Sequence, residues 1–405
     1  MKKINIKIIQ LLTAFIIVAS MFSCSPKPEL NALIVTGQNN HKWQGSNVLL
    51  KSILEKTDIF TVAVATSPGQ GRDMSGFEID FTPYDVVVLD YTGDEWPEVT
   101  KNNFLSYVEN GGGVVVYHAS NNAFPDWEEF NQIIGLGGWG DRDESAGPYV
   151  YVKDGEIVRD DSPGRAGSHG PQHEFLIETF QPEHPIMKGL PLKWLHIQDE
   201  LYSELRGPGE NMEILATAYA DKEFNGTERN EPMLFTISYG EGRIFHTAIG
   251  HAGNGELFHP AMECAGFITS LQRGAEWAAT GKVTQKVPDG LPTETETVRW
   301  KYLEYLDLEI IREKIMDYEI GKSTNCFVAL KDMINEEISN PSKMDEYNTL
   351  IIDILNNGKT GIEGKKILLK EFSWFADNDY KPVYEKLISN PELKDEAAYA
   401  LELIN

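Results

Sequence analysis

The sequence predicts that three residues able to perform acid–base or metal chemistry meet at one edge of a sheet: Glu200, His118 and His251. His118 follows residues 113–117, a run so apolar that we expect a central strand covered on both faces. His251 follows a second predicted strand, residues 243–249. Ligands of open α/β sheets bind beyond the carboxyl ends of the strands, so both rings are expected in that crevice. A carboxylate there is a candidate general base, and the imidazoles are candidate electrophilic partners or ligands of a divalent metal such as zinc.

Glu200 is assigned to the polar face of a predicted strand over residues 195–205. Successive side chains of a strand alternate between its two faces, so Glu200 shares its face with His196 and Tyr202. The apolar residues between them are expected to face the core, and Asp199 is expected to point away from the polar face. Tyr202 is therefore predicted to bind substrate beside Glu200.

Three further polar residues are predicted to bind substrate. His41 lies in a polar loop after the predicted strand 32–35, and Asp90 directly follows the predicted strand 84–89. Both are expected on the same rim as His118. His173 lies in a polar stretch in the middle of the chain, where no strand pattern fixes its position.

The elements around these residues alternate between strand and helix. Helices are expected over residues 46–56 and 100–110, with a further strand over residues 60–65. This alternation predicts right-handed crossovers and a doubly wound, mainly parallel sheet, so the fold class is α/β. Residues 233–239 and 243–249 surround a glycine-rich turn and are expected to form a hairpin.

The amino terminus predicts export. Residues 1–23 have a basic head and a short apolar run, which is the pattern of a signal peptide, and a small residue precedes Cys24. We expect Cys24 to be the lipidated first residue of a bacterial lipoprotein that faces the periplasm or the cell surface. The alternative is a simple signal peptide cleaved nearby.

The net charge of −26 makes nucleic acid an unsuitable partner, because the protein surface repels phosphate. The same charge repels anionic headgroups, so membrane attachment is expected only through the lipid.

Two domains are expected in the mature chain. The α/β domain covers residues 24–280, and residues 281–299 have the proline- and threonine-rich composition of an exposed linker. Residues 300–405 show helical periodicity and predict an all-α domain similar to HEAT repeats. Such helix pairs commonly bind other proteins, so a protein partner is expected there.

Several ordered motifs between about residues 30 and 280 resemble the ThuA-like family, which is named for trehalose utilisation. These motifs are Gly113-Val-Val-Val-Tyr-His118, His184-Pro-Ile, Asp199-Glu-Leu-Tyr202, Gly240-Glu-Gly-Arg and Arg273-Gly-Ala-Glu-Trp277. The family is similar to the class I glutamine amidotransferases, which implies a flavodoxin-like core. In that wider group the elbow after the central strand presents a nucleophilic cysteine. Here the elbow reads Tyr117-His118-Ala119-Ser120, so cysteine-dependent glutamine hydrolysis is not expected, and Ser120 lacks the G-x-S-x-G elbow of a serine nucleophile.

The resemblance implies a role in disaccharide catabolism through 3-keto sugars, with a carbohydrate as the ligand. A ketone at C3 acidifies the proton at C2, so a base such as Glu200 and a group that stabilises the enolate could drive elimination or isomerisation. The expected enzyme is a hydrolase, lyase or isomerase of keto sugars. The alternative is a non-catalytic lipoprotein that binds sugar or assembles other proteins.

Overall fold

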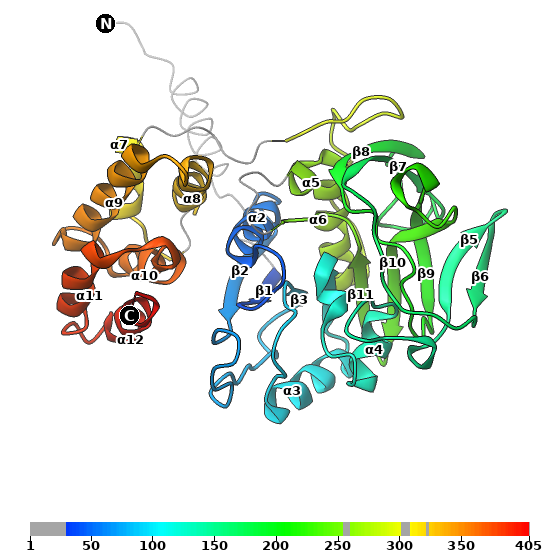
Figure 1. Cartoon of the computed structure of the whole chain (residues 1–405), viewed down its shortest axis with the longest axis horizontal. Helices are drawn as coiled ribbons and strands as arrows, with labels where there is room; N and C mark the ends of the chain where they lie inside the picture. The colour runs from blue at the N-terminus through cyan, green and yellow to red at the C-terminus, as the bar shows by residue number, and fades with distance from the viewer. Residues whose placement is uncertain (1–29, 254–259, 301–307, 321–323, 405) are drawn as a thin grey trace, which may run out of the picture.

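The computed structural model describes residues 30–253, 260–300, 308–320 and 324–404 (Figure 1). The predicted signal peptide and Cys24 lie outside these residues. No helix within the described ranges has the length and apolar character needed to cross a bilayer.

One sheet of eleven strands forms the centre of the amino-terminal domain. Its first half is parallel, with the strand order β2-β1-β3-β4-β11. These strands are β1 (Leu30–Thr36), β2 (Phe60–Thr66), β3 (Val86–Leu89), β4 (Gly113–Tyr117) and β11 (Gly242–Thr247). The predicted α/β class and its parallel core are therefore confirmed.

The sheet continues beyond β11 with antiparallel strands in the order β10-β9-β7-β8, and β5 and β6 branch from β10. The predicted hairpin is the β10–β11 pair. The strands of this half are β5 (Tyr149–Lys153), β6 (Glu156–Asp160), β7 (His173–Thr179), β8 (Lys193–Asp199), β9 (Met212–Tyr219) and β10 (Asn230–Tyr239).

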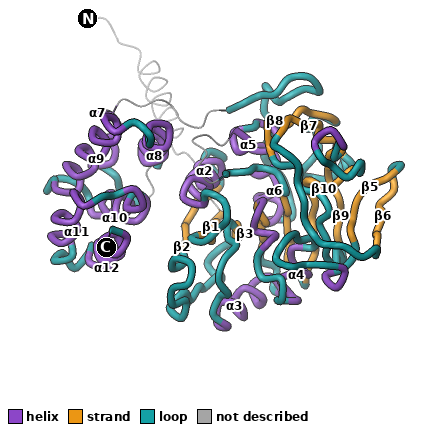
Figure 2. Tube along the Cα trace, in the orientation of Figure 1, coloured by secondary structure: helices purple, strands orange, loops and turns teal. Residues whose placement is uncertain are grey.

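Helices cover both faces of the parallel half, as a doubly wound sheet requires (Figure 2). Side chains of α2 and α6 share one buried cluster with one face, and those of α3 and α4 share another with the opposite face. The helices of this domain are α2 (Trp43–Glu55), α3 (Glu98–Glu109), α4 (Glu128–Ile134), α5 (Pro260–Glu263) and α6 (Ala265–Thr280). Short 3₁₀ turns add η1 (His118–Asn122), η2 (Glu144–Ala146) and η3 (Lys222–Phe224).

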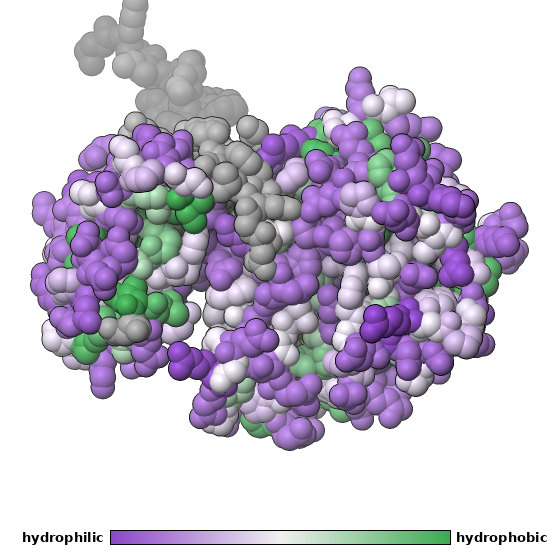
Figure 3. Space-filling view, viewed as in Figure 1, coloured by the Kyte–Doolittle hydropathy of each residue, from purple (hydrophilic) through white to green (hydrophobic). Residues whose placement is uncertain are grey.

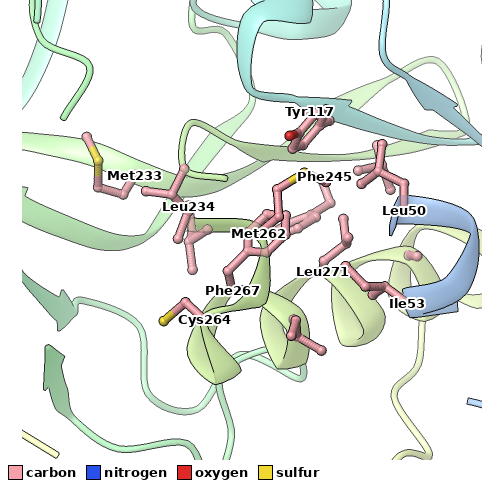
Figure 4. Close-up of a cluster of buried hydrophobic side chains, with 14 of the residues drawn as sticks. Leu50, Ile53, Tyr117, Met233, Leu234, Phe245, Met262, Cys264, Phe267 and Leu271 are labelled. Atoms are coloured by element: carbon pink, nitrogen blue, oxygen red, sulfur yellow. The ribbon is translucent and has the colours of Figure 1, made fainter. Parts of the chain in front are cut away.

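The core below the site is made by aromatic and aliphatic side chains of the sheet and of α6. Figure 4 shows Tyr117 and Phe245 of the sheet facing Phe267 and Leu271 of the helix. Each large side chain buried in this way stabilises the fold by roughly 1.5–3 kcal/mol. Gly274 allows the close approach, because a Cβ at this position would lie 2.1 Å from the Phe245 ring.

The carboxy-terminal helices form a separate lobe with its own apolar core (Figure 1). This helical region agrees with the predicted all-α domain, and its assignment to HEAT repeats stays a prediction. It contains α7 (Leu308–Met316), α8 (Asn325–Glu337), α9 (Pro341–Asn356), α10 (Ile362–Glu371), η4 (Ser373–Phe375), η5 (Asn378–Tyr380), α11 (Lys381–Leu387) and α12 (Lys394–Leu403). The lobe contacts α2, where the Thr324 hydroxyl donates to the Glu55 carboxylate at 3.1 Å. Figure 3 shows a mainly hydrophilic surface on this view of the molecule, in line with the acidic composition.

The segment predicted as an exposed linker, residues 281–299, runs along the α/β domain. The amide of Ala265 donates to the Val298 carbonyl at 2.9 Å, and the amide of Leu195 donates to the Thr293 carbonyl at 2.7 Å. The proline and threonine content that indicated an exposed linker gave no sign of these backbone pairings.

The predicted alternation over residues 195–205 is wrong. The strand β8 ends at Asp199, so Glu200 follows the strand instead of belonging to it. His196 and Asp199 are fully buried, whereas Leu195 is only partly buried. The physical reason is the aromatic environment, because Phe175 and Trp194 enclose the His196 ring at centroid distances of 5.2 and 5.6 Å.

Candidate metal centre

Four residues from four segments meet at the carboxyl edge of the parallel strands: His41, His118, Glu200 and His251. His41 follows β1, His118 follows β4 and His251 follows β11, which is the placement that a parallel sheet gives to ligand-binding residues. One nitrogen or oxygen from each residue can be chosen so that all four atoms lie within 4.8 Å of one another. The predicted convergence of Glu200 with His118 and His251 is thus present, and His41 joins them.

The separations within the cluster suit a small metal ion. Glu200 Oε2 lies 3.1 Å from His251 Nδ1, 3.7 Å from His118 Nε2 and 3.8 Å from His41 Nε2. The two ring nitrogens of His118 and His251 are 3.3 Å apart. Ligand atoms bound tetrahedrally to zinc at about 2.1 Å are roughly 3.4 Å from one another. The atoms of this cluster, all within 4.8 Å, would need to move together by about 1 Å or less to bind the ion.

Neighbouring groups fix which nitrogen of His118 and of His41 faces the cluster. His118 Nδ1 lies 2.7 Å from the Ala248 carbonyl oxygen, so this nitrogen carries the proton and Nε2 keeps its lone pair. His41 Nδ1 lies 3.2 Å from the Asn40 side-chain oxygen and takes the same arrangement. Histidine ligands of metals are commonly oriented by such outer hydrogen bonds.

The charge states also match those of metal ligands. Burial, together with the nearby rings of His118 and His251, lowers the pKa of His41 from 6.5 to about 4, so the ring is neutral at pH 7. Burial would raise the pKa of Glu200, but the neighbouring imidazoles of His118, His251 and His41 lower it below its ordinary value. A neutral imidazole and an ionised carboxylate need not lose a proton before they bind a cation.

His118 occupies a strained elbow. Its φ is +43°, in the left-handed region that residues with a side chain seldom adopt, and such strain is concentrated at functional sites. The Tyr202 ring stacks on His118 with the centroids 4.3 Å apart. Ser120 is buried beneath the elbow, where its hydroxyl donates to the Leu89 carbonyl at 2.7 Å and accepts from the Tyr91 amide at 2.9 Å. The elbow therefore presents an imidazole, and the serine hydroxyl serves to hold the backbone.

A cavity of about 710 Å³ lies over the cluster. His41, Glu200 and His251 lie in its wall, together with aromatic rings and side-chain amides. These are Trp43, Trp139, Tyr202, Gln38, Asn39, Asn40, Gln70 and Asn122. The wall thus combines flat apolar faces with many hydrogen-bonding groups.

His169 also lines the cavity, and sequence reasoning did not select it. Its Nε2 lies 3.8 Å from Glu200 Oε1, which is the carboxylate oxygen facing away from the other three histidines. His169 lies in a loop and follows no strand, so nothing in the sequence distinguished it from the nearby His173.

The structure does not place His173 or Asp90 in the cavity wall. The His173 ring stacks on Phe224 with the centroids 3.8 Å apart and the planes inclined by 8°. Asp90 is fully buried below the rim, where its carboxylate accepts from the hydroxyls of Ser46 at 2.8 Å and Thr36 at 3.1 Å. Of the residues predicted to bind substrate, His41 and Tyr202 line the cavity.

The variant Asp90→Asn is expected to change how stability depends on pH. Burial raises the pKa of Asp90 from 3.8 to about 8, against the hydrogen bonds from Ser46, Thr36 and Asn39. The folded protein thus keeps a proton that the unfolded chain releases, and wild-type stability should fall as the pH rises through this window. The slope is on the order of 1 kcal/mol per pH unit. Asparagine cannot ionise, so urea unfolding at pH 5 to 8 should show a flatter profile for the variant; parallel profiles would contradict the assignment.

The α/β domain matches one known protein family over almost its whole length. The family model described as "Trehalose utilisation", ThuA, matches residues 31–278, which is more than half of the chain. The chain belongs to the ThuA family. It is similar to a ThuA-like protein of known crystal structure from Parabacteroides merdae, with 58% identity and a TM-score of 0.66, covering 67% of this chain and 98% of the other.

A second ThuA-like structure, from Bacteroides uniformis, is 18% identical with a TM-score of 0.43 and covers 64% of this chain and 94% of the other. No functionally curated protein matches the chain. The family match ends at residue 278, so the helical lobe lies outside it.

Proposed function

We propose that this ThuA-family protein is a divalent-metal-dependent enzyme of carbohydrate catabolism that acts on a 3-keto disaccharide or glycoside. The single observation that carries the proposal is the cluster of three histidines and one carboxylate in a cavity of about 710 Å³. The trehalose-utilisation family supports a disaccharide as the starting compound.

Zinc is the metal that the cluster suits best, since imidazole nitrogens and a carboxylate oxygen are among its preferred ligands. His41, His118, His251 and Glu200 Oε2 would hold it. A bound zinc ion would polarise a carbonyl or activate a water molecule.

The cavity wall supports a sugar as the ligand. Trp43 and Trp139 supply flat apolar faces, and the amides of Gln70 and Asn122 supply donors and acceptors that can pair with hydroxyl groups. Trp139 is held against Tyr202 with the ring centroids 4.7 Å apart, so its indole is preorganised.

Glu200 and His169 are the groups that would transfer protons. The C2 proton of a 3-keto sugar is acidic, and a base that removes it leaves an enolate at the C3 oxygen. Return of electrons from the enolate expels the C1 alkoxide, which takes a proton and leaves as an alcohol, while the sugar becomes a 1,2-unsaturated ketone. Glu200 Oε1 and His169 Nε2, 3.8 Å apart, could take one proton and supply the other. Reprotonation at C2 from the opposite face would instead give isomerisation.

The test compares trehalose with 3-keto-trehalose. Purified protein is expected to bind about one zinc ion per cluster and to convert the keto sugar alone, with a conjugated enone detected by ultraviolet absorbance. Chelation should abolish turnover, and added zinc should restore it. A protein that binds the keto sugar calorimetrically but leaves it unchanged would favour the alternative of a sugar-binding protein, and a protein that binds no divalent metal would overturn the proposal.

A further inference from the structure

Asp199 has a fully buried side chain that none of the proposed chemistry uses. It is the last residue of β8 and directly precedes Glu200. Its Oδ1 accepts from the backbone amides of Glu200 at 2.7 Å and His251 at 3.1 Å. Its Oδ2 accepts from the Gly250 amide at 2.7 Å and from His196 Nε2 at 2.7 Å. Each carboxylate oxygen therefore accepts one hydrogen bond from β8 or the residue after it and one from the segment 250–251.

These hydrogen bonds join parts of the sheet that no strand pairing holds together. Glu200 follows β8, and His251 lies in the segment after β11. In the sheet β8 and β11 are separated by β10, β9 and β7, so ladder hydrogen bonds do not connect them directly. The Asp199 carboxylate makes this connection at the position where the two candidate ligands must meet.

The groups around Asp199 are themselves fixed. The His196 ring lies among the aromatic side chains of Phe175 and Trp194 and is fully buried. On the other side, the Gly250 carbonyl accepts from the Tyr117 hydroxyl, and its amide donates to Asp199. Gly250 has a φ of +106°, which places its amide and carbonyl between these two partners and favours glycine. The hydrogen-bond partners of the Asp199 carboxylate, His196 and Gly250, are therefore each held in place by other residues.

We propose that Asp199 is the positioning residue of the metal centre. By holding the amides of Glu200 and His251 on one oxygen atom, it sets the separation between these two ligands before the ion binds. Outer groups that orient metal ligands commonly change metal affinity by about 10- to 100-fold when they are removed. The inference rests on the proposed metal site and adds to it a residue that never touches the ion.

The test measures binding of Zn²⁺ and Co²⁺ by the full chain with Asp199→Asn. Asparagine keeps the shape but replaces one acceptor oxygen with a donor group, so the amides on that side lose their partner. We expect affinity for Zn²⁺ to fall about 10- to 100-fold and the visible spectrum of bound Co²⁺ to change, since that spectrum reports ligand geometry.

Glu276→Gln is the matched control. Glu276 is also buried, and its carboxylate also accepts backbone amides of another segment, those of Thr284 at 2.8 Å and Gln285 at 3.2 Å. It lies near the carboxy-terminal end of α6, away from the cluster, so its loss should leave metal affinity and the Co²⁺ spectrum unchanged. The control separates loss of a buried carboxylate from loss of ligand positioning.

His196→Phe is the second variant, for use if Asp199→Asn does not fold. It keeps an aromatic ring between Phe175 and Trp194 but removes the donor to Asp199, and it should shift the Co²⁺ spectrum in the same direction with a smaller loss of affinity. Wild-type affinity and spectrum in either soluble variant would overturn the positioning role while leaving the metal site intact. Equal losses in Glu276→Gln would also overturn it, and a wild-type protein without metal would overturn both the proposed function and this inference.

Discussion

Replacing Glu200 with glutamine is expected to lower the affinity for zinc by roughly 100-fold or more and to abolish turnover of the keto sugar. The change keeps the size of the side chain but removes the only anionic member of the four-residue cluster. An amide oxygen is a weak zinc ligand, and loss of a ligand itself should exceed the effect of losing an outer group. Competition with a chromogenic chelator gives the affinity, and metal content after dialysis gives the stoichiometry.

Glu183→Gln is the control for this experiment. Its carboxylate forms a solvent-exposed ion pair with Lys188 at 3.1 Å, which contributes little, so zinc binding and turnover should match the wild type. Circular dichroism should show both variants folded. Retention of zinc and activity by Glu200→Gln would remove Glu200 from both of its proposed roles.

The sequence predicted the positions of the three clustered histidines because each one follows a strand of the parallel part of the sheet. Residues 113–117 are apolar throughout because β4 is covered on both faces, and the change to a polar residue marks the end of the strand at His118. Since parallel strands bring their carboxyl ends to one edge, His41 and His251 followed from the same rule. These local patterns were sufficient to predict that His41, His118 and His251 lie at the same edge of the sheet.

Glu200 was placed near the site by an incorrect argument. Alternation assumed a regular strand through residue 200, whereas β8 ends at Asp199 and, among the strands that the structure describes, pairs with β7 alone. The burial of His196 and Asp199 depends on hydrogen bonds to segments that are distant in sequence, including the Gly250 amide. Periodicity describes one strand and its two faces, so it cannot reveal a buried polar pair of this kind.

The remainder of the cavity wall, beyond the predicted His41, Glu200, Tyr202 and His251, could not be predicted from the sequence because loops form most of it. Trp139 lies in a loop held by the buried guanidinium of Arg142, which donates to the carbonyls of Gly138, Asn122 and Ala123. No motif marks an arginine that organises a loop through backbone carbonyls. For the same reason the sequence could not show that His169 lines the cavity and that His173, four residues later, does not.

His169→Gln is expected to reduce kcat by about 100- to 1000-fold and to leave zinc stoichiometry and affinity unchanged. His169 Nε2 lies 3.8 Å from Glu200 Oε1 and its side chain is 37% exposed at the cavity, so it can exchange protons with both substrate and solvent. Its Nδ1 lies 2.8 Å from the Gly170 carbonyl oxygen, which leaves Nε2 as the nitrogen that faces Glu200. Glutamine can form hydrogen bonds but cannot transfer protons near neutral pH, and positioned proton transfer contributes about 10²- to 10⁴-fold to rates. KM should change little.

His173→Gln provides the matched control, since His173 is close in sequence but its ring stacks on Phe224 and does not line the cavity. The kcat and KM of this variant should equal those of the wild type. A His169→Gln variant with unchanged kcat would assign proton transfer to Glu200 alone. A variant with lowered zinc affinity would instead make His169 part of the metal centre, because a group that only moves protons has no effect on binding of the ion.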